Sequence, residues 1–202
     1  MKAGEKYNVP SNEGEWEVLP NLKGLKTKQE IDEFEVASFA KAEIILTQSL
    51  TDETLFHLKY IYAIHKTAFE ELYSFAGNLR TVNMSKGGFP FPAAKFLPQA
   101  MQQFEKEVLT ILPNKYNNKS DLIKDIAKVH GELLYIHPFR EGNGRTARLL
   151  ANLMSYKAGY SRLQFELLNN EVKFKDYITA VQKVAEQNYS YMEKIISFVF
   201  AG

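Results

Sequence analysis

The segment from Leu122 to Ile136 constrains the fold most, because its helical pattern is too apolar for a half-exposed surface helix. Its apolar members are Leu122, Ile123, Ile126, Val129, Leu133, Leu134 and Ile136. We therefore expect a buried helix at the centre of the domain, capped at its start by Ser120 or Asp121. Pro138 disfavours helix in the residue before it, so this helix is expected to end at His137.

Helical spacing recurs along most of the chain, and the sequence predicts an all-α fold, a helical bundle around that buried central helix. A capping-box pattern at Thr27–Glu30 indicates the start of the first helix, and Thr51 to Thr54 resembles the cap of a second one that continues to Phe69. Further helices are expected at 97–112, at about 145–159, at about 170–184 and at about 189–200.

One segment, 81–96, breaks the helical pattern. Val82 and Met84 alternate there with polar residues, and Gly87-Gly88 come directly before Phe89. This arrangement predicts a single short β-hairpin.

Length and composition favour one globular domain. The chain has 202 residues, of which 45% are hydrophobic and 24% charged. We expect a compact domain over 27–202, preceded by an extended arm over 1–26 that Trp16, Val18 and Leu19 could anchor.

Charge and cysteine content exclude several classes of function. A net charge of +1 gives no basis for a nucleic-acid partner. The absence of cysteine excludes disulfides, thiolate metal sites and cysteine nucleophiles. No signal peptide and no membrane-length apolar segment is visible, so a cytoplasmic protein without a membrane partner is expected.

The residues after the central helix form a dense polar cluster, His-Pro-Phe-Arg-Glu-Gly-Asn-Gly-Arg-Thr-Ala-Arg at 137–148. Gly142 and Gly144 let the backbone turn just before a new helix, whose unpaired N–H groups and dipole favour an anion. Arg145 and Arg148 lie on neighbouring positions of one face and can grip phosphate oxygens. The segment therefore predicts a polyphosphate cradle.

Two further residues suit chemistry on such a ligand. Glu141 is the cluster's one carboxylate and would repel phosphate unless a Mg²⁺ ion joined them. His137 has an ordinary pKa of about 6.5, which suits a general base near neutral pH. His137 could instead be a structural histidine, and the arginines could belong to a solvated helix start. These interpretations would need a separate cause for each residue, whereas one ligand site explains all of them together. A metal site of His57, His65, His130 and His137 lacks a local third ligand, and His65 and His130 are expected to be core residues.

The cluster resembles the signature of the Fic family, His-x-Phe-x-Asp/Glu-Gly-Asn-Gly-Arg-x-x-Arg, at every fixed position. The resemblance extends to Ala76–Phe89, which is similar to the family's turn and flap, to Ile64–Phe69, and to Leu19–Leu25. It covers about residues 19–200 and implies the Fic fold with its β-hairpin flap.

The resemblance implies a protein adenylyltransferase, which moves AMP from ATP to a Ser, Thr or Tyr hydroxyl of a target protein and releases pyrophosphate. By this resemblance His137 is the catalytic base, Glu141 holds Mg²⁺, and the flap docks the target chain by β-augmentation. The residues expected to contact ATP or its phosphates are Lys86, Gly87, Gly88, Phe89, Gly142, Asn143, Gly144, Arg145, Thr146, Ala147, Arg148 and, near the base, Asn170. The residues expected to dock the target are Asn83, Met84, Ser85 and Lys86.

Two alternatives and one regulatory question stay open at this point. Some relatives have Lys in place of Gly144 and transfer the γ-phosphoryl group, so a phosphotransferase or another nucleotide-donor transferase is one alternative. A non-catalytic nucleotide-binding module is another. The family's inhibitory pattern, Ser/Thr-x-x-x-Glu-Gly/Asn, is absent, and Glu186 follows Gln182 rather than Ser or Thr. The resemblance then implies a toxin held by a separate small antitoxin whose Glu reaches Arg148, with type II topoisomerase ATPase subunits as targets by analogy.

Overall fold

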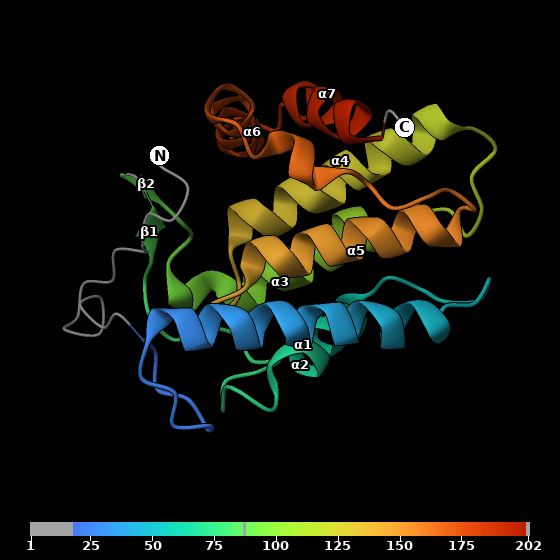
Figure 1. Ribbon diagram of the computed structural model, residues 1–202. Helices are drawn as coiled ribbons and strands as arrows, with labels where there is room; N and C mark the ends of the chain where they lie inside the picture. The colour runs from blue at the N-terminus through green and yellow to red at the C-terminus, as the bar shows by residue number, and fades with distance from the viewer. Residues whose placement is uncertain (1–17, 87, 201–202) are drawn as a thin grey trace.

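The computed structural model describes residues 18–86 and 88–200; Met1–Glu17, Gly87 and 201–202 lie outside the described residues. Helices dominate the described part, and two short antiparallel strands form its sheet. The helices and strands are α1 Lys28–Gln48, α2 Leu58–Phe69, β1 Ser85–Lys86, β2 Phe89–Pro90, α3 Leu97–Phe104, α4 Lys119–Ile136, α5 Asn143–Lys157, α6 Glu171–Val184 and α7 Ser190–Val199 (Figure 1). Shorter helical segments are η2 Ala94–Phe96, η3 Glu105–Leu109 and η4 Phe165–Leu168.

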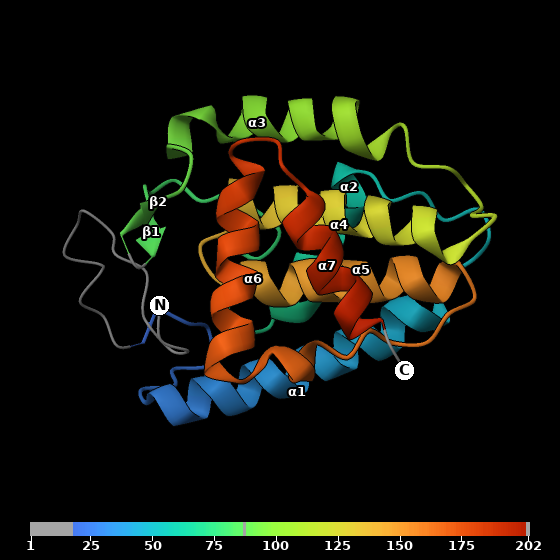
Figure 2. The ribbon, with the colours of Figure 1, turned by 90° about the horizontal axis from the view of Figure 1, so that it is seen from above.

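Helix α4 is the centre of the bundle, as the sequence predicts. It lies beside α5, with α6 and α7 on one side of this pair and α1 and α2 on the other (Figure 1). Seen from above, α6 crosses α4 and α5 at the end where β1 and β2 lie (Figure 2). The connection between α4 and α5, the hairpin and α6 therefore meet at one end of the molecule.

Local sequence signals gave some helix boundaries correctly. Thr27 and Glu30 form the predicted capping box at the start of α1. Helix α4 ends with His137 as its C-cap, in agreement with the effect of Pro138. Gly159, with φ 81°, follows directly after the C-cap of α5.

Other boundaries were predicted wrongly because a competing cap lies nearby. The N-cap of α2 is His57, whose Nδ1 accepts from the Tyr60 N–H, while Thr51 and Thr54 close a separate turn before it. The N-cap of α4 is Asn118 rather than Ser120 or Asp121, and its side chain accepts from the Asp121 N–H. An Asn cap satisfies the first turn as well as Ser does, so the sequence alone does not separate them.

Three predicted elements differ in extent. The expected helix over 97–112 is α3 followed by the π-helical segment η3, in which the Thr110 N–H donates to the Glu105 carbonyl. Helix α5 begins at Asn143, before the predicted start near Arg145. The hairpin is short, with Ser85 opposite Pro90 in its register.

The described part of the N-terminal arm contacts the core. Val18 and Leu19 are partly buried against it, as expected, and the Leu22 N–H donates to the Leu72 carbonyl at 2.8 Å. Trp16 and the rest of the predicted arm up to Glu17 lie outside the described residues. Over 18–86 and 88–200, no helix is long and apolar enough to cross a membrane.

Candidate active site

His137 lies where α4 ends and the polar cluster begins. Its backbone is left-handed, with φ 54° and ψ 57°. Its Nδ1 lies 3.0 Å from the Leu134 carbonyl, which can only accept, so Nδ1 carries the proton in the neutral ring. The basic nitrogen of the imidazole is therefore Nε2.

Two features keep this imidazole neutral. The Phe91 ring stacks on it with ring centroids 3.8 Å apart, and His137 is 5% exposed. Burial lowers the pKa of His137 to about 3, and the nearby charges of Arg80 and Lys86 lower it further. A neutral base is thus present at any physiological pH, as proton abstraction requires.

Arg80 joins the flap to the polar cluster, and the sequence analysis missed it. The residue is 4% exposed, and Nε donates to the His137 carbonyl at 2.8 Å. Its other nitrogens donate to the carbonyls of Val82 and Pro92, both at 2.6 Å. No local pattern indicates a buried arginine, because only the Val82 acceptor is close in the chain, while His137 lies 57 residues away.

The loop before α5 is held in one shape. The Asn143 side chain accepts from the Phe139 N–H and donates to the Phe139 carbonyl, both at 2.8 Å. Gly142 has φ 75°, and a Cβ there would lie 2.1 Å from Cε2 of Phe69. Backbone conformation and space both require glycine at 142.

Gly144 is different, because the fold does not require a glycine there. A Cβ at this position would meet nothing within 4 Å. Thr146 and Ala147, in the same helical turn, are buried, and the Thr146 N–H already donates to the Gly142 carbonyl at 2.9 Å. The open space at Gly144 lets a ligand approach the start of α5 closely.

Glu141 and Arg145 belong to a chain of charged contacts. Glu141 Oε1 accepts from the Gly142 N–H at 2.8 Å and lies 3.6 Å from Arg145 Nη2. The same Nη2 lies 2.5 Å from Oε2 of Glu35, and Tyr73 donates to Oε1 of Glu35 at 2.8 Å. The sequence analysis missed Glu35 and Tyr73, although Glu35 shares the buried face of α1 with Ile31.

Arg148 lies among aromatic rings. The centre of its guanidinium is 5.7 Å from the Phe165 ring centroid and 5.8 Å from that of Tyr177. Its Nε is buried with no hydrogen-bond partner among the described residues. Within 18–86 and 88–200, no carboxylate lies within ion-pair distance of this guanidinium.

A cavity of about 130 Å³ brings the flap, the polar cluster and α6 together. It is lined by Lys86, Phe89, Phe91, Leu134, His137, Gly144, Arg148, Phe174, Tyr177, Ile178, Val181 and Gln182. The wall from α6 was not predicted, although its members follow helical spacing over 174–182 and could have been recognised as one face.

Asn170 lies one turn before this wall and is the N-cap of α6. Its Oδ1 accepts from the Lys173 N–H at 2.9 Å, and its Nδ2 donates to the Leu167 carbonyl at 3.2 Å. A contact between Asn170 and a nucleotide base stays a prediction.

The predicted flap residues take different positions. The Asn83 side chain accepts from the Ala94 N–H at 2.8 Å and closes the base of the hairpin, while Met84 is buried. Ser85 and Lys86 form β1, and the next described residue, Gly88, has φ 78°. Docking of a target chain at this hairpin stays a prediction.

Two of the other histidines are core residues. His65 Nε2 donates to the Glu141 carbonyl at 3.0 Å, and its ring stacks on Phe139 at 3.9 Å. His130 Nδ1 donates to the Ala147 carbonyl at 3.1 Å. Burial lowers the pKa of His65 to about 4 and that of His130 to about 3. The part of the chain that the structure describes holds no group of three or more His, Cys, Asp or Glu side chains able to hold a metal ion.

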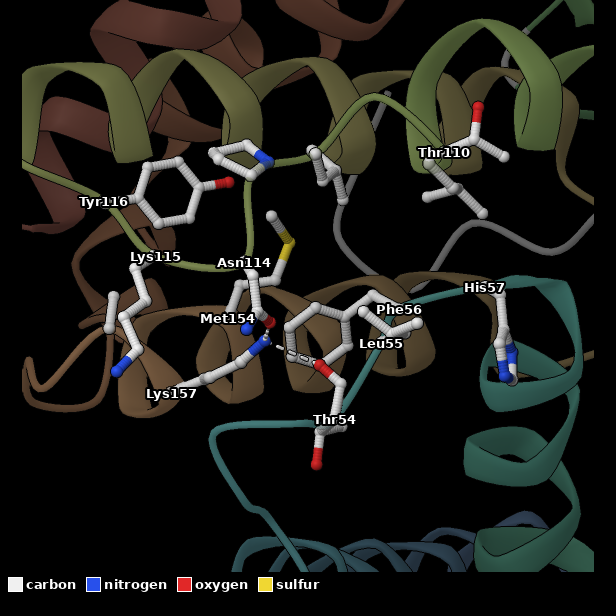
Figure 3. A pocket seen from close by; sticks show the side chains of 14 residues that line it. Thr54, Leu55, Phe56, His57, Thr110, Asn114, Lys115, Tyr116, Met154 and Lys157 are labelled. Carbon is white, nitrogen blue, oxygen red and sulfur yellow. Dashed lines mark hydrogen bonds between the residues drawn. The ribbon is translucent and has the colours of Figure 1, made fainter.

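A larger cavity, of about 260 Å³, lies at the opposite end of α5 (Figure 3). Its Lys157 donates to the Thr54 carbonyl at 2.7 Å and to Asn114 Oδ1 at 2.6 Å (Figure 3). Helix geometry puts Lys157 about 20 Å along α5 from Gly144. Because Lys157 ties three segments together there, we assign this cavity a structural role.

Comparison with known proteins identifies the family that this chain matches. The Fic/DOC family matches residues 55–155. Protein adenylyltransferase VbhT of Bartonella schoenbuchensis is 30% identical over 79% of this chain and 33% of that protein. Probable protein adenylyltransferase y4lH of Sinorhizobium fredii is 28% identical, over 81% of both chains. This chain thus spans a third of VbhT and most of y4lH.

Solved structures show the same fold. The BepC protein of Bartonella tribocorum, crystallised with bound AMPPNP, superposes with a TM-score of 0.74 over 90% of this chain and 91% of that one, at 21% identity. A Fic domain of a Bartonella quintana effector with bound ADP gives a TM-score of 0.72 over 90% of both chains, at 22% identity.

Proposed function

Because the chain belongs to the Fic/DOC family, we propose that it is a protein adenylyltransferase, which transfers AMP from ATP to a hydroxyl side chain of a target protein. The names of its relatives support this activity. The observation that carries the proposal is that one cavity holds a neutral imidazole, the open start of α5 at Gly144, and Arg148 without a carboxylate partner among the described residues.

The start of α5 suits a triphosphate. Its first N–H groups and the positive end of its dipole favour an anion. The absence of a Cβ at Gly144 leaves space for a phosphate against the backbone, and the Arg148 guanidinium can donate to phosphate oxygens. Lys at 144, as in phosphotransferase relatives, would fill that space, so Gly144 favours AMP transfer over phosphoryl transfer.

His137 performs the proton transfer in the proposed reaction. Its Nε2 accepts the proton of the target hydroxyl while that oxygen forms a bond to the α-phosphorus. The bond from the α-phosphorus to the bridging oxygen breaks, and pyrophosphate leaves with the electron pair. The hydrogen bond from Nδ1 to Leu134 keeps the imidazole in the tautomer that this step needs.

The residues present fit a magnesium ion. Glu141 is a half-buried single carboxylate beside the phosphate cradle, and Mg²⁺ is commonly held by one or two carboxylates together with phosphate oxygens. When bound, the ion would neutralise charge on the phosphates. Glu141 would hold it, and Arg145 and Arg148 would supply further positive charge.

The flap is the proposed docking element for the target. Strand β1 contributes Ser85 and Lys86, and we propose that an extended target segment docks along this hairpin by β-augmentation. Asn83 closes the base of the hairpin through its hydrogen bond with the Ala94 N–H, and Met84 is buried beside it in the chain. Docking at β1 would bring a target hydroxyl toward the cavity that His137 lines.

A role as a toxin restrained by a separate antitoxin is the finer form of the proposal, in a cytoplasmic setting and with a topoisomerase ATPase subunit as target by analogy. Its support is the unpaired charge of Arg148 within the described residues. Glu186 does not provide that pairing, because its carboxylate bonds to Lys183 at 2.9 Å and is 62% exposed. An antitoxin glutamate could therefore bind Arg148 and compete with phosphate.

Transfer of label from ATP tests the activity. Purified protein with Mg²⁺ and ATP labelled at either the α- or the γ-phosphate should label itself or a lysate protein only from the α position. His137→Ala should reduce this labelling by about 10²- to 10⁴-fold, because only the proton transfer is lost. The same variant should still bind ATP.

Label from the γ position would instead indicate a phosphotransferase. Undiminished labelling by the His137→Ala variant would overturn the assigned base. If the wild type binds ATP but transfers no label, the result would favour the alternative of a non-catalytic nucleotide-binding module.

A further inference from the structure

Glu35 is a buried carboxylate in the middle of α1, far along the chain from the polar cluster. It is 4% exposed, and it occupies the same helix face as the buried residues Ile31, Ala42 and Leu46. Carboxylates are almost never buried to this degree unless they are paired, because desolvation disfavours the charged form. The contacts of Glu35 therefore explain its position.

Its partner is the first arginine of the polar cluster. Oε2 of Glu35 lies 2.5 Å from Arg145 Nη2, and Oε1 accepts from the Tyr73 hydroxyl at 2.8 Å. The guanidinium centre of Arg145 also lies 5.2 Å from the Phe39 ring centroid and 5.4 Å from that of Phe69. One carboxylate and two ring faces thus hold this guanidinium in place.

A second carboxylate lies close to the same nitrogen. Glu141 Oε1 is 3.6 Å from Arg145 Nη2, so the Arg145 guanidinium lies between two carboxylates and is nearer to that of Glu35. Residues 141 and 145 are four apart, a spacing at which opposite charges pair readily on a helix. Without the Glu35 carboxylate, Glu141 would be the nearest acid to Arg145.

We propose that Glu35 is a positioning residue that holds Arg145 nearer to itself than to Glu141 and so keeps the Glu141 carboxylate available to a divalent cation. The inference rests on the proposed function, since it assigns Glu141 to Mg²⁺. Tyr73 takes part by fixing the rotamer of Glu35. Removing the Glu35 charge leaves Arg145 to pair with Glu141. The divalent cation must then compete with the Arg145 guanidinium for the carboxylate oxygens of Glu141.

The test measures Mg²⁺-dependent ATP binding by calorimetry, in a His137→Ala background that prevents turnover. Glu35→Gln keeps the shape of the side chain and removes its charge. We expect the Mg²⁺ concentration for half-maximal ATP binding to rise about tenfold. Substitutions of residues that orient a metal ligand typically have effects of this size. Tyr73→Phe should shift it in the same direction by a smaller factor.

The matched control is Glu33→Gln on the same helix, where the carboxylate is exposed and accepts from Gln29. Its Mg²⁺ titration should superimpose on that of the background protein. A purely structural role for Glu35 would lower the melting temperature and leave the Mg²⁺ titration unchanged, and that outcome overturns the inference. If Glu35→Gln does not fold, an unchanged titration in Tyr73→Phe overturns it equally.

The same data separate this inference from the proposed activity. A wild-type protein that binds ATP with Mg²⁺ but transfers no AMP contradicts the activity, while the Glu35 shift remains measurable. A wild-type protein whose ATP binding does not depend on Mg²⁺ contradicts the role of Glu35 directly.

Discussion

Arg145 and Arg148 stand one helical turn apart, yet the chain surrounds them differently. Arg145 faces the α1 side, where the buried Glu35 and the partly exposed Glu141 balance its charge. Arg148 faces the α6 side, where it meets Phe165 and Tyr177, and no carboxylate of the described residues pairs with it. The folded structure therefore fixes the first arginine in place, while no carboxylate of the described residues balances the charge of the second.

The largest expected effect comes from removing each arginine in turn. Arg145→Met should lower the free energy of unfolding by about 3–5 kcal/mol, because it leaves Glu35 buried without a cation. Arg148→Met should lower it by about 1–2 kcal/mol, the worth of buried cation–π contacts, and should weaken ATP binding strongly. Urea denaturation and calorimetric titration with ATP measure the two effects, and equal losses of stability would break the comparison.

Acid sensitivity is the next effect, and buried histidines contribute to it on both sides: His65 near Arg145 and His130 near Arg148. Tyr177 and Arg148 face His130, whose folded pKa is lowered to about 3, mainly by burial. The unfolded chain binds a proton at this residue below about pH 6.5 and the folded chain does not, so stability falls as the pH drops from 6.5 toward 3. This residue should remove about 2 kcal/mol between pH 7 and pH 5.

Urea unfolding at both pH values checks this expectation. His130→Gln should reduce the difference between pH 7 and pH 5 by about 2 kcal/mol relative to the wild type. An unchanged pH dependence in the variant would show that His130 does not stay neutral in the fold.

The smallest effect compares the two tyrosines that support the arginines. Tyr73 donates to the Glu35 carboxylate, and Tyr177 donates to the neutral Nε2 of His130 at 2.6 Å. Hydrogen bonds to charged groups are worth more, so Tyr73→Phe should cost about 2 kcal/mol and Tyr177→Phe about 1 kcal/mol. Thermal or urea unfolding of the two variants gives the order, and a reversed order would contradict a charged Glu35.

The sequence predicted what is encoded locally. The apolar pattern of α4, its end before Pro138 and the capping box at Thr27 depend on neighbours within a few residues, and the structure agrees with them. The Fic fold and the flap were expected from a motif whose spacing is local too. A one-turn error in a cap, as at His57, arises because several residues nearby can satisfy the same N–H groups.

The supporting residues of the site could not be predicted in the same way. Glu35 stands among other acids in a charged part of α1, and only the packing of α1 against α5 buries it. Arg80 bonds to carbonyls that lie up to 57 residues away in the chain. Such long-range contacts leave no periodic signal, so the sequence indicated the reacting groups but not what holds them.

The left-handed backbone of His137 lowers the stability of the folded chain at the position of the proposed base. Side chains with a Cβ are disfavoured in that conformation by roughly 1–2 kcal/mol, and glycine commonly closes a helix at such a corner. Folding stability alone would therefore favour glycine over histidine at this position. The strain at this one residue accompanies the placement of an imidazole on the cavity wall, at the end of the buried helix α4.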